Sequence, residues 1–229
     1  IFFFFFFFVL LFYCDQVSKM ELAGLVVGLG NPGQQYAGTR HNCGFAFIDA
    51  LLADCHKISQ VEKMGGQQFF CQLWRSRLPD NMGTWLCAKP QTFMNESGKS
   101  VQALLSWFKL APGQLVVVHD ELDIPPGEIR FKLGGGNAGH NGLRSIEQYI
   151  GSNAYYRLRI GIGKPAHKGE TLGWVLGRAP GAEQTIFSHA IHNSVEVFYT
   201  FAKDGLKAAV VKAKQFKKQK KTPTGEDKK

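Results

Sequence analysis

Leu25-Val26-Val27-Gly28-Leu29-Gly30 and Leu115-Val116-Val117-Val118 are the two stretches of sequence that decide the fold. Each is a short, wholly apolar run, which is typical of a strand buried on both faces of a parallel sheet. The first run leads into Asn31-Pro32-Gly33 and the second into His119-Asp120-Glu121, so polar residues follow each strand directly. We therefore expect ligand-binding residues just beyond the carboxyl ends of these strands.

Outward from these two strands, helical and strand patterns alternate along the chain. Apolar residues at helical spacing predict helices from about Asn42, over 97–110, around 143–150 and over 182–202. Strands are predicted over 69–74, 84–88 and 158–162. This order indicates an α/β fold with a single domain, in which a twisted, mixed and mostly parallel β-sheet is covered by helices on both faces.

Composition limits the class of protein. The chain has 229 residues, of which 45% are hydrophobic, so it can bury a core and is not globally disordered. Its 27 Lys and Arg against 18 Asp and Glu give a net charge of +9. Much of the excess lies in a Lys-rich C-terminal segment, 206–229, which is expected to be partly disordered. The segment is either a solvated terminus or an arm that attracts a polyanion, and composition alone does not separate the two.

The N-terminal residues 1–19 do not match the rest of the chain. Residues 1–12 are all apolar, but this run is too short to span a bilayer and has no basic region before it. Because Met20 directly precedes the first strand pattern, we expect residues 1–19 to be a non-native leader and the domain to cover 20–205. Five scattered cysteines without a C-x-x-C pair indicate reduced thiols in a cytoplasmic protein and no metal site.

Three nucleotide or nucleophile motifs are incomplete. Gly28–Gly33 matches G-x-G-x-x-G, but the next helix pattern begins only near Asn42 and Asp49 lies inside that helix and not at the end of a strand, so a dinucleotide site is disfavoured. Gly98-Lys99-Ser100 lacks the earlier glycine of a phosphate-binding loop, since that position is Phe93. No G-x-S-x-G elbow is present to seat a nucleophilic serine.

A histidine base is the remaining candidate for catalysis. His41 lies in a polar segment just ahead of a helix, and Asp120 directly follows an apolar strand. If the two meet, the carboxylate fixes the tautomer of the imidazole and leaves its other nitrogen free to take a proton from water. Asn31, Asn95 and Asn141 supply amide dipoles at three strand ends. The set suits hydrolysis of a reactive acyl bond.

A glycine-rich loop lies between cationic residues in the sequence. Gly134-Gly135-Gly136 directly follows Lys132 and Leu133 and leads to His140 and Asn141. Two further cations, Arg157 and Arg159, come later, in the alternating segment of the next predicted strand. Solvated surface charge and binding of a phosphate are both compatible with these residues.

Taken together, these segments resemble the bacterial-type peptidyl-tRNA hydrolases from about residue 25 to residue 205. The resemblance is carried by several motifs in the expected order, namely Asn31-Pro32-Gly33, Tyr36, Thr39-Arg40-His41-Asn42, Lys89-Pro90-Gln91-Thr92-Phe93-Met94-Asn95-Glu96-Ser97-Gly98, His119-Asp120-Glu121-Leu122-Asp123, and Lys132–Gly136 with Gly139-His140-Asn141-Gly142-Leu143.

The resemblance implies a role for each matched residue. His41 would be the general base and Asp120 would stabilise its working form. Asn141 would orient water or stabilise the oxyanion, and Asn31 would help distinguish N-blocked from free aminoacyl groups. The implied substrate-binding residues are Tyr36, Phe93, Met94, Asn95 and Asn141 for the peptide and the acylated tRNA end, and Lys132 and Arg159 for the tRNA 5′ phosphate.

The implied reaction is hydrolysis of the ester between a peptide and the 3′-terminal ribose of tRNA, which recycles tRNA in translation. The family's enzymes are cytoplasmic monomers that need no metal or other cofactor, so peptidyl-tRNA is the expected partner and no membrane is involved. The alternatives are a non-catalytic RNA-binding protein of the same fold and a nucleotide-dependent enzyme that uses the Gly28–Gly33 turn. The presence of His41, Asp120 and the three asparagines favours the hydrolase.

Overall fold

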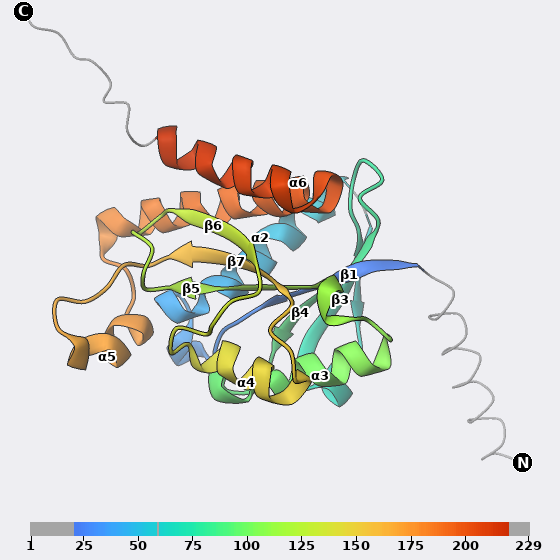
Figure 1. Ribbon diagram of the computed structural model, residues 1–229, viewed down its shortest axis with the longest axis horizontal. Helices are drawn as coiled ribbons and strands as arrows, with labels where there is room; N and C mark the ends of the chain where they lie inside the picture. Colours follow the sequence, from blue (N-terminus) through green and yellow to red (C-terminus); the bar gives the residue numbers. More distant parts are fainter. Residues whose placement is uncertain (1–20, 59, 220–229) are drawn as a thin grey trace, which may run out of the picture.

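The computed structural model describes residues 21–58 and 60–219 (Figure 1). The expected leader 1–19 and the last ten residues of the Lys-rich segment lie outside the described residues. The strands are β1 (Leu22–Gly28), β2 (Val61–Met64), β3 (Cys71–Arg77), β4 (Thr84–Pro90), β5 (Leu115–Glu121), β6 (Ile129–Leu133) and β7 (Tyr156–Gly161). The helices are α2 (Cys43–Ile58), α3 (Ser97–Trp107), α4 (Asn141–Ile150), α5 (Thr171–Leu176) and α6 (Gly181–Gln219), with short 3₁₀ turns η1 (Gln34–Tyr36), η2 (Arg40–Asn42), η3 (Gln67–Phe69), η4 (Met94–Glu96), η5 (Pro112–Gln114) and η6 (Lys168–Glu170).

All seven described strands form one mixed sheet in the order β2-β3-β4-β1-β5-β7-β6. β1 pairs in parallel with β4 and β5, and β5 pairs in parallel with β7. The pairs at the two edges, β2–β3, β3–β4 and β6–β7, are antiparallel. The predicted mixed α/β sheet is therefore confirmed, but it has three parallel and three antiparallel pairs and not the parallel majority that was expected. The parallel pairs join the four strands β4, β1, β5 and β7.

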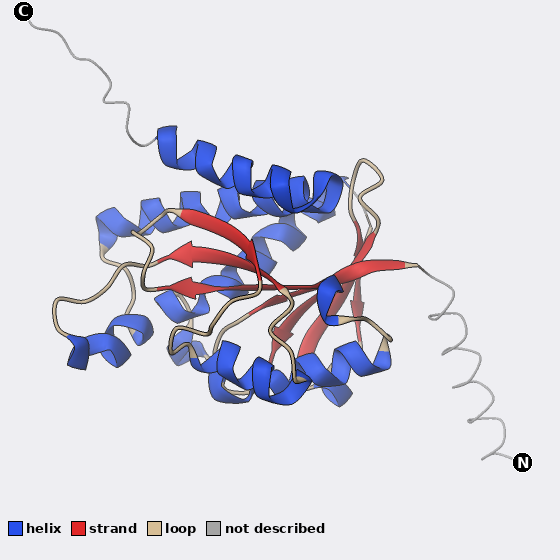
Figure 2. Ribbon diagram, in the orientation of Figure 1, coloured by secondary structure: helices blue, strands red, loops and turns tan. Residues whose placement is uncertain are grey.

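The two faces of the sheet carry separate apolar cores, which explains why the central strands are apolar at every position. Val26 and Val116 pack with α2 and α6 on one face, whereas Val27 and Val117 pack with α3 and α4 on the other. Figure 2 shows the resulting three layers, with the strands between the two sets of helices. The prediction of helices on both faces is confirmed.

The glycines at the end of β1 bring the strand close to α2 and do not form a nucleotide turn. A Cβ atom on Gly28 would lie 2.0 Å from the backbone oxygen of Gly44, so only glycine fits at this crossing. The chain then forms η1 and η2 before α2 begins at Cys43. No helix opens directly at Gly28–Gly33, and the geometry that a dinucleotide phosphate needs is missing there.

Two edge strands and one helix were not predicted. In β6 the sequence Ile129-Arg130-Phe131-Lys132-Leu133 alternates, with Ile129 and Phe131 buried against α6. The pattern was readable, but the adjacent glycines favoured a loop. β2 and α5 are short and only partly buried, so their periodicity is weak.

The last helix is longer than the predicted helix over 182–202. Residues 206–219 continue α6 beyond a non-helical Gly205, so the helix is kinked at residue 205 and does not end there. Leu206, Ala209, Val210, Ala213 and Phe216 recur at helical spacing and pack on the α2–α6 core. Lys207 and Lys214 are exposed, whereas Lys212 and Lys217 pair with Glu196 and Glu128. The charge of these lysines obscured the apolar stripe in the sequence. Across the described part of the chain, no helix has the length and apolar character needed to cross a membrane.

Candidate active site

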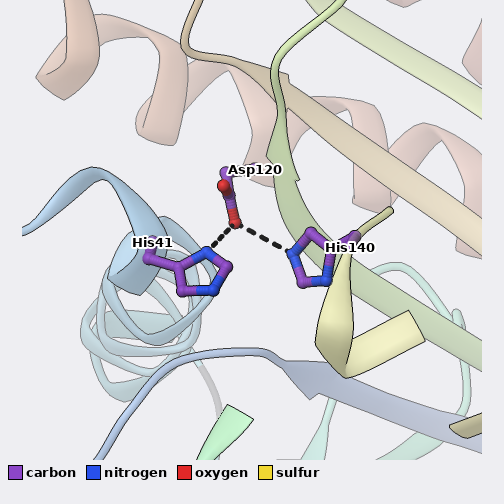
Figure 3. Close-up of side chains that lie close together, drawn as sticks. All are labelled: His41, Asp120 and His140. Carbon is purple, nitrogen blue, oxygen red and sulfur yellow. Dashed lines mark hydrogen bonds and ion pairs between the residues drawn. The ribbon is translucent and has the colours of Figure 1, made fainter. Parts of the chain in front are cut away.

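The predicted His–Asp pair is formed. Asp120 lies near the end of β5 and His41 lies in η2, and His41 Nδ1 is 2.8 Å from Asp120 Oδ1 (Figure 3). Both residues are buried, with 8% and 3% of their surface exposed. Because the buried carboxylate is an acceptor, His41 donates through Nδ1–H and its Nε2 is the nitrogen left to accept a proton.

A second histidine, His140, completes the cluster. Its Nε2 is 3.0 Å from the same Asp120 oxygen, so Figure 3 shows the carboxylate between two imidazole rings. Its Nδ1 accepts hydrogen bonds from the backbone N–H groups of Gly142, at 3.1 Å, and Leu143, at 3.4 Å, and so caps α4. Two N–H donors at Nδ1 require a lone pair there, so the proton of His140 sits on Nε2 and is donated to Asp120.

The electrostatics of the pair support a carboxylate beside a basic imidazole. Burial alone would raise the pKa of Asp120, but His41 and His140 outweigh it through charge and hydrogen bonds, and the pKa falls well below its usual range. Burial alone would lower the pKa of His41, but the charge and hydrogen bond of Asp120 outweigh it and raise that pKa above 6.5. Asp120 thus stabilises the imidazolium that forms when His41 takes a proton.

A third histidine, His119, supports the cluster from behind. It is fully buried, its Nδ1 lies 2.6 Å from the backbone oxygen of Asp120, and its ring packs edge-on against His140 with centroids 5.0 Å apart. Burial, followed by the nearby charge of His140, lowers the pKa of His119 well below 6.5. His119 is therefore neutral at physiological pH and supports the site through its hydrogen bond to the Asp120 backbone and through packing.

The donor atoms of His41, Asp120 and His140 lie within 4.8 Å of one another, a spacing that a metal ion could use. The hydrogen bonds argue against that use. A metal on His140 Nε2 would move the ring proton to Nδ1, where it would face the two N–H groups of α4. The donor set therefore suits a proton-transfer network better than a metal ion.

Asn31 is placed by a bracket of hydrogen bonds at the end of β1. Its backbone N–H donates to Asn42 Oδ1, and Asn42 Nδ2 donates back to the Asn31 carbonyl oxygen, both at 2.9 Å. Its side-chain Oδ1 accepts from the Met94 backbone N–H at 2.8 Å, which ties β1 to η4. Its Nδ2 donates to no group in the described residues and is available to a ligand. Asn42 was not predicted as a site residue, although it directly follows His41.

A cavity of about 740 Å³ opens onto the cluster. His41, Asp120, His140 and Asn141 line its polar end, and Leu122, Leu172 and Val175 add apolar walls. Asn31 lies outside it, in a neighbouring groove of about 1190 Å³ that also includes Asn42 but not His41. The structure thus brings three of the four predicted catalytic residues to one cavity and places Asn31 beyond the His41 segment.

The predicted substrate-binding residues on η1 and η4 lie around these openings and line neither of them. Phe93 and Asn95 are exposed, Tyr36 is half-buried, and Met94 is buried against the α3–α4 core. Met94 therefore contributes through its backbone bond to Asn31 and through packing.

Lys132 and Arg159 lie on the adjacent strands β6 and β7, away from the cavity. Burial, followed by neighbouring cations, lowers the pKa of Lys132, and burial lowers that of Arg159 despite Glu121, whose carboxylate is 3.8 Å away. Arg157 is different because it is fully buried. It donates to the backbone oxygens of Gly135 and Gly136 and contacts Glu147 at 3.0 Å, so it holds the glycine loop in place.

The chain is similar to known proteins over most of its length. A model of the peptidyl-tRNA hydrolase family matches residues 25–222. The chain is 57% identical to a peptidyl-tRNA hydrolase of Desulfovibrio desulfuricans over 191 residues, which cover 83% of each protein. It is 48% identical to a peptidyl-tRNA hydrolase of Nitratidesulfovibrio vulgaris over 192 residues, which cover 83% of this chain and 96% of the relative.

A solved structure with the same family name is similar to this chain in fold as well as in sequence. The crystal structure of peptidyl-tRNA hydrolase from Acinetobacter baumannii superposes with a TM-score of 0.77 at 37% identity. The match covers 84% of this chain and 96% of the other. The family match also extends past Gly205, in agreement with the packed second half of α6.

Proposed function

Because the chain belongs to the peptidyl-tRNA hydrolase family and is an enzyme of that kind, we propose that His41 and Asp120 catalyse the hydrolysis of the ester between a peptide and the 3′-terminal ribose of tRNA. The observation that carries the proposal is the buried 2.8 Å contact between His41 and Asp120 at the end of a cavity. The family itself gives the substrate, peptidyl-tRNA.

The proposed chemistry has two proton transfers. His41 Nε2 takes a proton from water while the water oxygen attacks the ester carbonyl carbon. The tetrahedral intermediate then collapses, the bond from carbon to the ribose oxygen breaks, and the imidazolium returns its proton to that oxygen. Asp120 stabilises the imidazolium between the two steps. An activated water can hydrolyse an ester directly, so the reaction needs no nucleophilic side chain.

Amide side chains would stabilise the oxyanion and select the N-acylated substrate over the free aminoacyl group. Asn141, at the first turn of α4, would donate to the oxyanion from the wall of the cavity. Asn31 has a free Nδ2 and a fixed Oδ1, so it would present one donor to an acyl carbonyl near the α-nitrogen of the substrate. The groups that bond to Asn31 are amides of Asn42 and Met94 and not carboxylates, so the ammonium of a free aminoacyl group would have no counter-charge among them, which disfavours it.

The tRNA would be held by cations at some distance from the reaction. Lys132 and Arg159 lie together on β6 and β7 and would bind the 5′ phosphate, with Tyr36, Phe93 and Asn95 at the acylated end. We also propose that the enzyme acts as a cytoplasmic monomer without a metal or another cofactor. The four cysteines in the described residues form no disulfide, in keeping with a reducing compartment.

Peptide release from N-acetyl-aminoacyl-tRNA tests the proposal, with free aminoacyl-tRNA as the second substrate. The wild type should cleave the acylated substrate rapidly and spare the free one. His41→Ala should lower kcat by about 10²–10⁴-fold with little change in tRNA affinity, because it removes the base and no RNA contact. The matched control is His56→Ala on the exposed side of α2, which should behave like the wild type.

Two results would contradict the assignment. A His41→Ala protein that keeps most of its kcat would exclude His41 as the base. A folded wild type that binds tRNA and cleaves neither substrate would favour the alternative, a non-catalytic RNA-binding protein of the same fold.

A further inference from the structure

Two exposed aromatic side chains lie on neighbouring segments at the carboxyl edge of the central strands. Phe70 is 42% exposed and Phe93 is 55% exposed. The segments are joined, because the Gln91 backbone N–H donates to the Phe70 carbonyl oxygen at 2.7 Å and Cys71 pairs with Pro90. Since β3 runs antiparallel to β4, its first residues return to the edge at which β4 ends. Phe70 therefore lies at the same edge of the sheet as the candidate active site.

The backbone of Phe70 is unusual for an exposed bulky residue. Its φ of 54° and ψ of 39° fall in the left-handed region, which Gly or Asn adopts with less strain. Packing does not account for the phenylalanine, because the adjacent Phe69 fills the core against Trp107 and Phe108. Strain held at an exposed side chain is typical of positions that contact a ligand.

Lys99 lies over the ring of Phe70, with Nζ 4.0 Å from the centroid. It occupies the first turn of α3, where the helix dipole disfavours a cation, and the acidic residue at this end of the helix is Glu96 at the N-cap. Within the part of the chain that the structure describes, Lys99 forms no ion pair with Glu96 or with another acid. Lys99 is therefore available to pair with an anion beside the aromatic ring.

We propose that Phe70 and Lys99 extend the surface around Phe93 into a binding platform for the unpaired 3′-terminal nucleotides of tRNA. A base stacks on Phe70 and an adjacent phosphate pairs with Lys99, the combination by which proteins bind single-stranded nucleic acid without reading its sequence. The proposal rests on the proposed function, because it assigns part of the same substrate to this surface.

The peptide part of the substrate fits this surface less well. An aromatic ring with a fixed cation suits a base and a phosphate, whereas a peptide of arbitrary sequence carries no constant negative charge. The cavity at His41 also offers apolar walls from Leu122, Leu172 and Val175, on the side of the sheet toward β5 and α5. Phe70 and Lys99 lie on the other side of β1, toward β4 and β3. The tRNA end and the peptide would therefore extend from the ester bond in different directions.

Steady-state kinetics of two substrates test the platform: N-acetyl-aminoacyl-tRNA and N-acetyl-aminoacyl-adenosine, which lacks the preceding nucleotides. Phe70→Gly and Lys99→Gln should each raise KM for the tRNA by about tenfold with kcat nearly unchanged, and should leave KM for the adenosine substrate unaltered. Phe70→Gly also relaxes the left-handed backbone, so its thermal stability should be no lower than that of the wild type. A loss of binding then cannot be attributed to unfolding.

Two control variants separate the contribution of the ring from that of the charge. Phe70→Tyr keeps a ring and should keep the wild-type KM. Lys109→Gln removes the same charge from an exposed position at the other end of α3 and should have little effect. An equal rise in KM for both substrates would place the contact on the acyl group instead and overturn the proposal, as would an unchanged KM for the tRNA in Phe70→Gly.

Direct binding separates this proposal from the proposed function. The wild type should bind the oligonucleotide CCA more tightly than Phe70→Gly by about tenfold, whether or not the protein hydrolyses either substrate. Equal affinity of the two proteins for CCA would refute the platform while leaving the hydrolase assignment intact.

Discussion

The charged side chains at the end of β5 and at the β6–β7 edge differ in how far neighbouring groups of the protein compensate their charge. At the end of β5, Asp120 is buried between two histidines that both bond to it, so the charged group is satisfied by the protein itself. On β6 and β7, Lys132 and Arg159 lie close to each other and to Arg157, Glu121 is the acid whose charge acts on both, and the pKa of each is lowered by burial and by the neighbouring cations. The first region is complete without substrate, whereas the second is a set of like charges that an added anion would stabilise.

From this difference we expect the end of β5 to serve the chemical step and the β6–β7 edge to serve substrate binding. A network that is satisfied in the free protein holds its atoms in place before substrate arrives, which is what proton transfer requires. A cluster of cations with too few acids gains most from binding a phosphate, which is what affinity requires. Substitutions in the two regions should therefore change different kinetic constants.

The largest effect is expected for Asp120→Asn. Loss of the carboxylate removes the charge that stabilises the His41 imidazolium and the acceptor that fixes its tautomer, so kcat should fall by up to about 10⁴-fold. In the wild type, kcat/KM should rise as pH increases through the raised pKa of His41, because the free base is the active form. In Asp120→Asn the pH midpoint of the residual activity should move lower, and a pH–rate profile with an unmoved midpoint would contradict the pairing.

An intermediate effect is expected for His140→Asn. Asparagine is a good helix N-cap, so α4 should keep its start and the thermal stability should change little. Asp120 would lose one of its two donors, become a stronger partner for His41 and raise the His41 pKa further. A hydrogen bond of about 1.4 kcal/mol corresponds to about tenfold in the protonation equilibrium. The pH midpoint should thus rise, opposite to Asp120→Asn, and a downward movement would contradict the role of His140.

The smallest effect on the chemical step is expected at the β6–β7 edge. Lys132→Ala and Arg159→Ala should each raise KM for acylated tRNA by about tenfold, lower the dependence of binding on salt by about one phosphate contact, and leave kcat and its pH dependence unchanged. Lys203→Ala, which removes an exposed Lys that pairs with Asp80 at 3.2 Å, is the matched control. A fall in kcat without a rise in KM would place these cations in the chemical step and erase the contrast between the two regions.

Some features could be predicted from the sequence because their signal is local. The apolar runs of β1 and β5 gave a buried parallel sheet, and the polar residues after them gave the edge at which the site lies. His41 and Asp120 were paired by this strand-end rule together with the family resemblance. The second half of α6 was missed for the opposite reason, since ten lysines in residues 203–229 outweighed a stripe of small and apolar residues in our interpretation.

The sequence by itself therefore determined the layers of the fold, the family and the pairing of His41 with Asp120. Tertiary structure alone decided which nitrogen of each histidine carries the proton, that Arg157 is buried and bonds to the glycine loop, and that Phe70 is held exposed under Lys99. The physical reason is that periodicity and turn chemistry act over a few neighbouring residues. Hydrogen-bond direction, burial and the field of distant charges exist only after strands from different parts of the chain have been brought side by side.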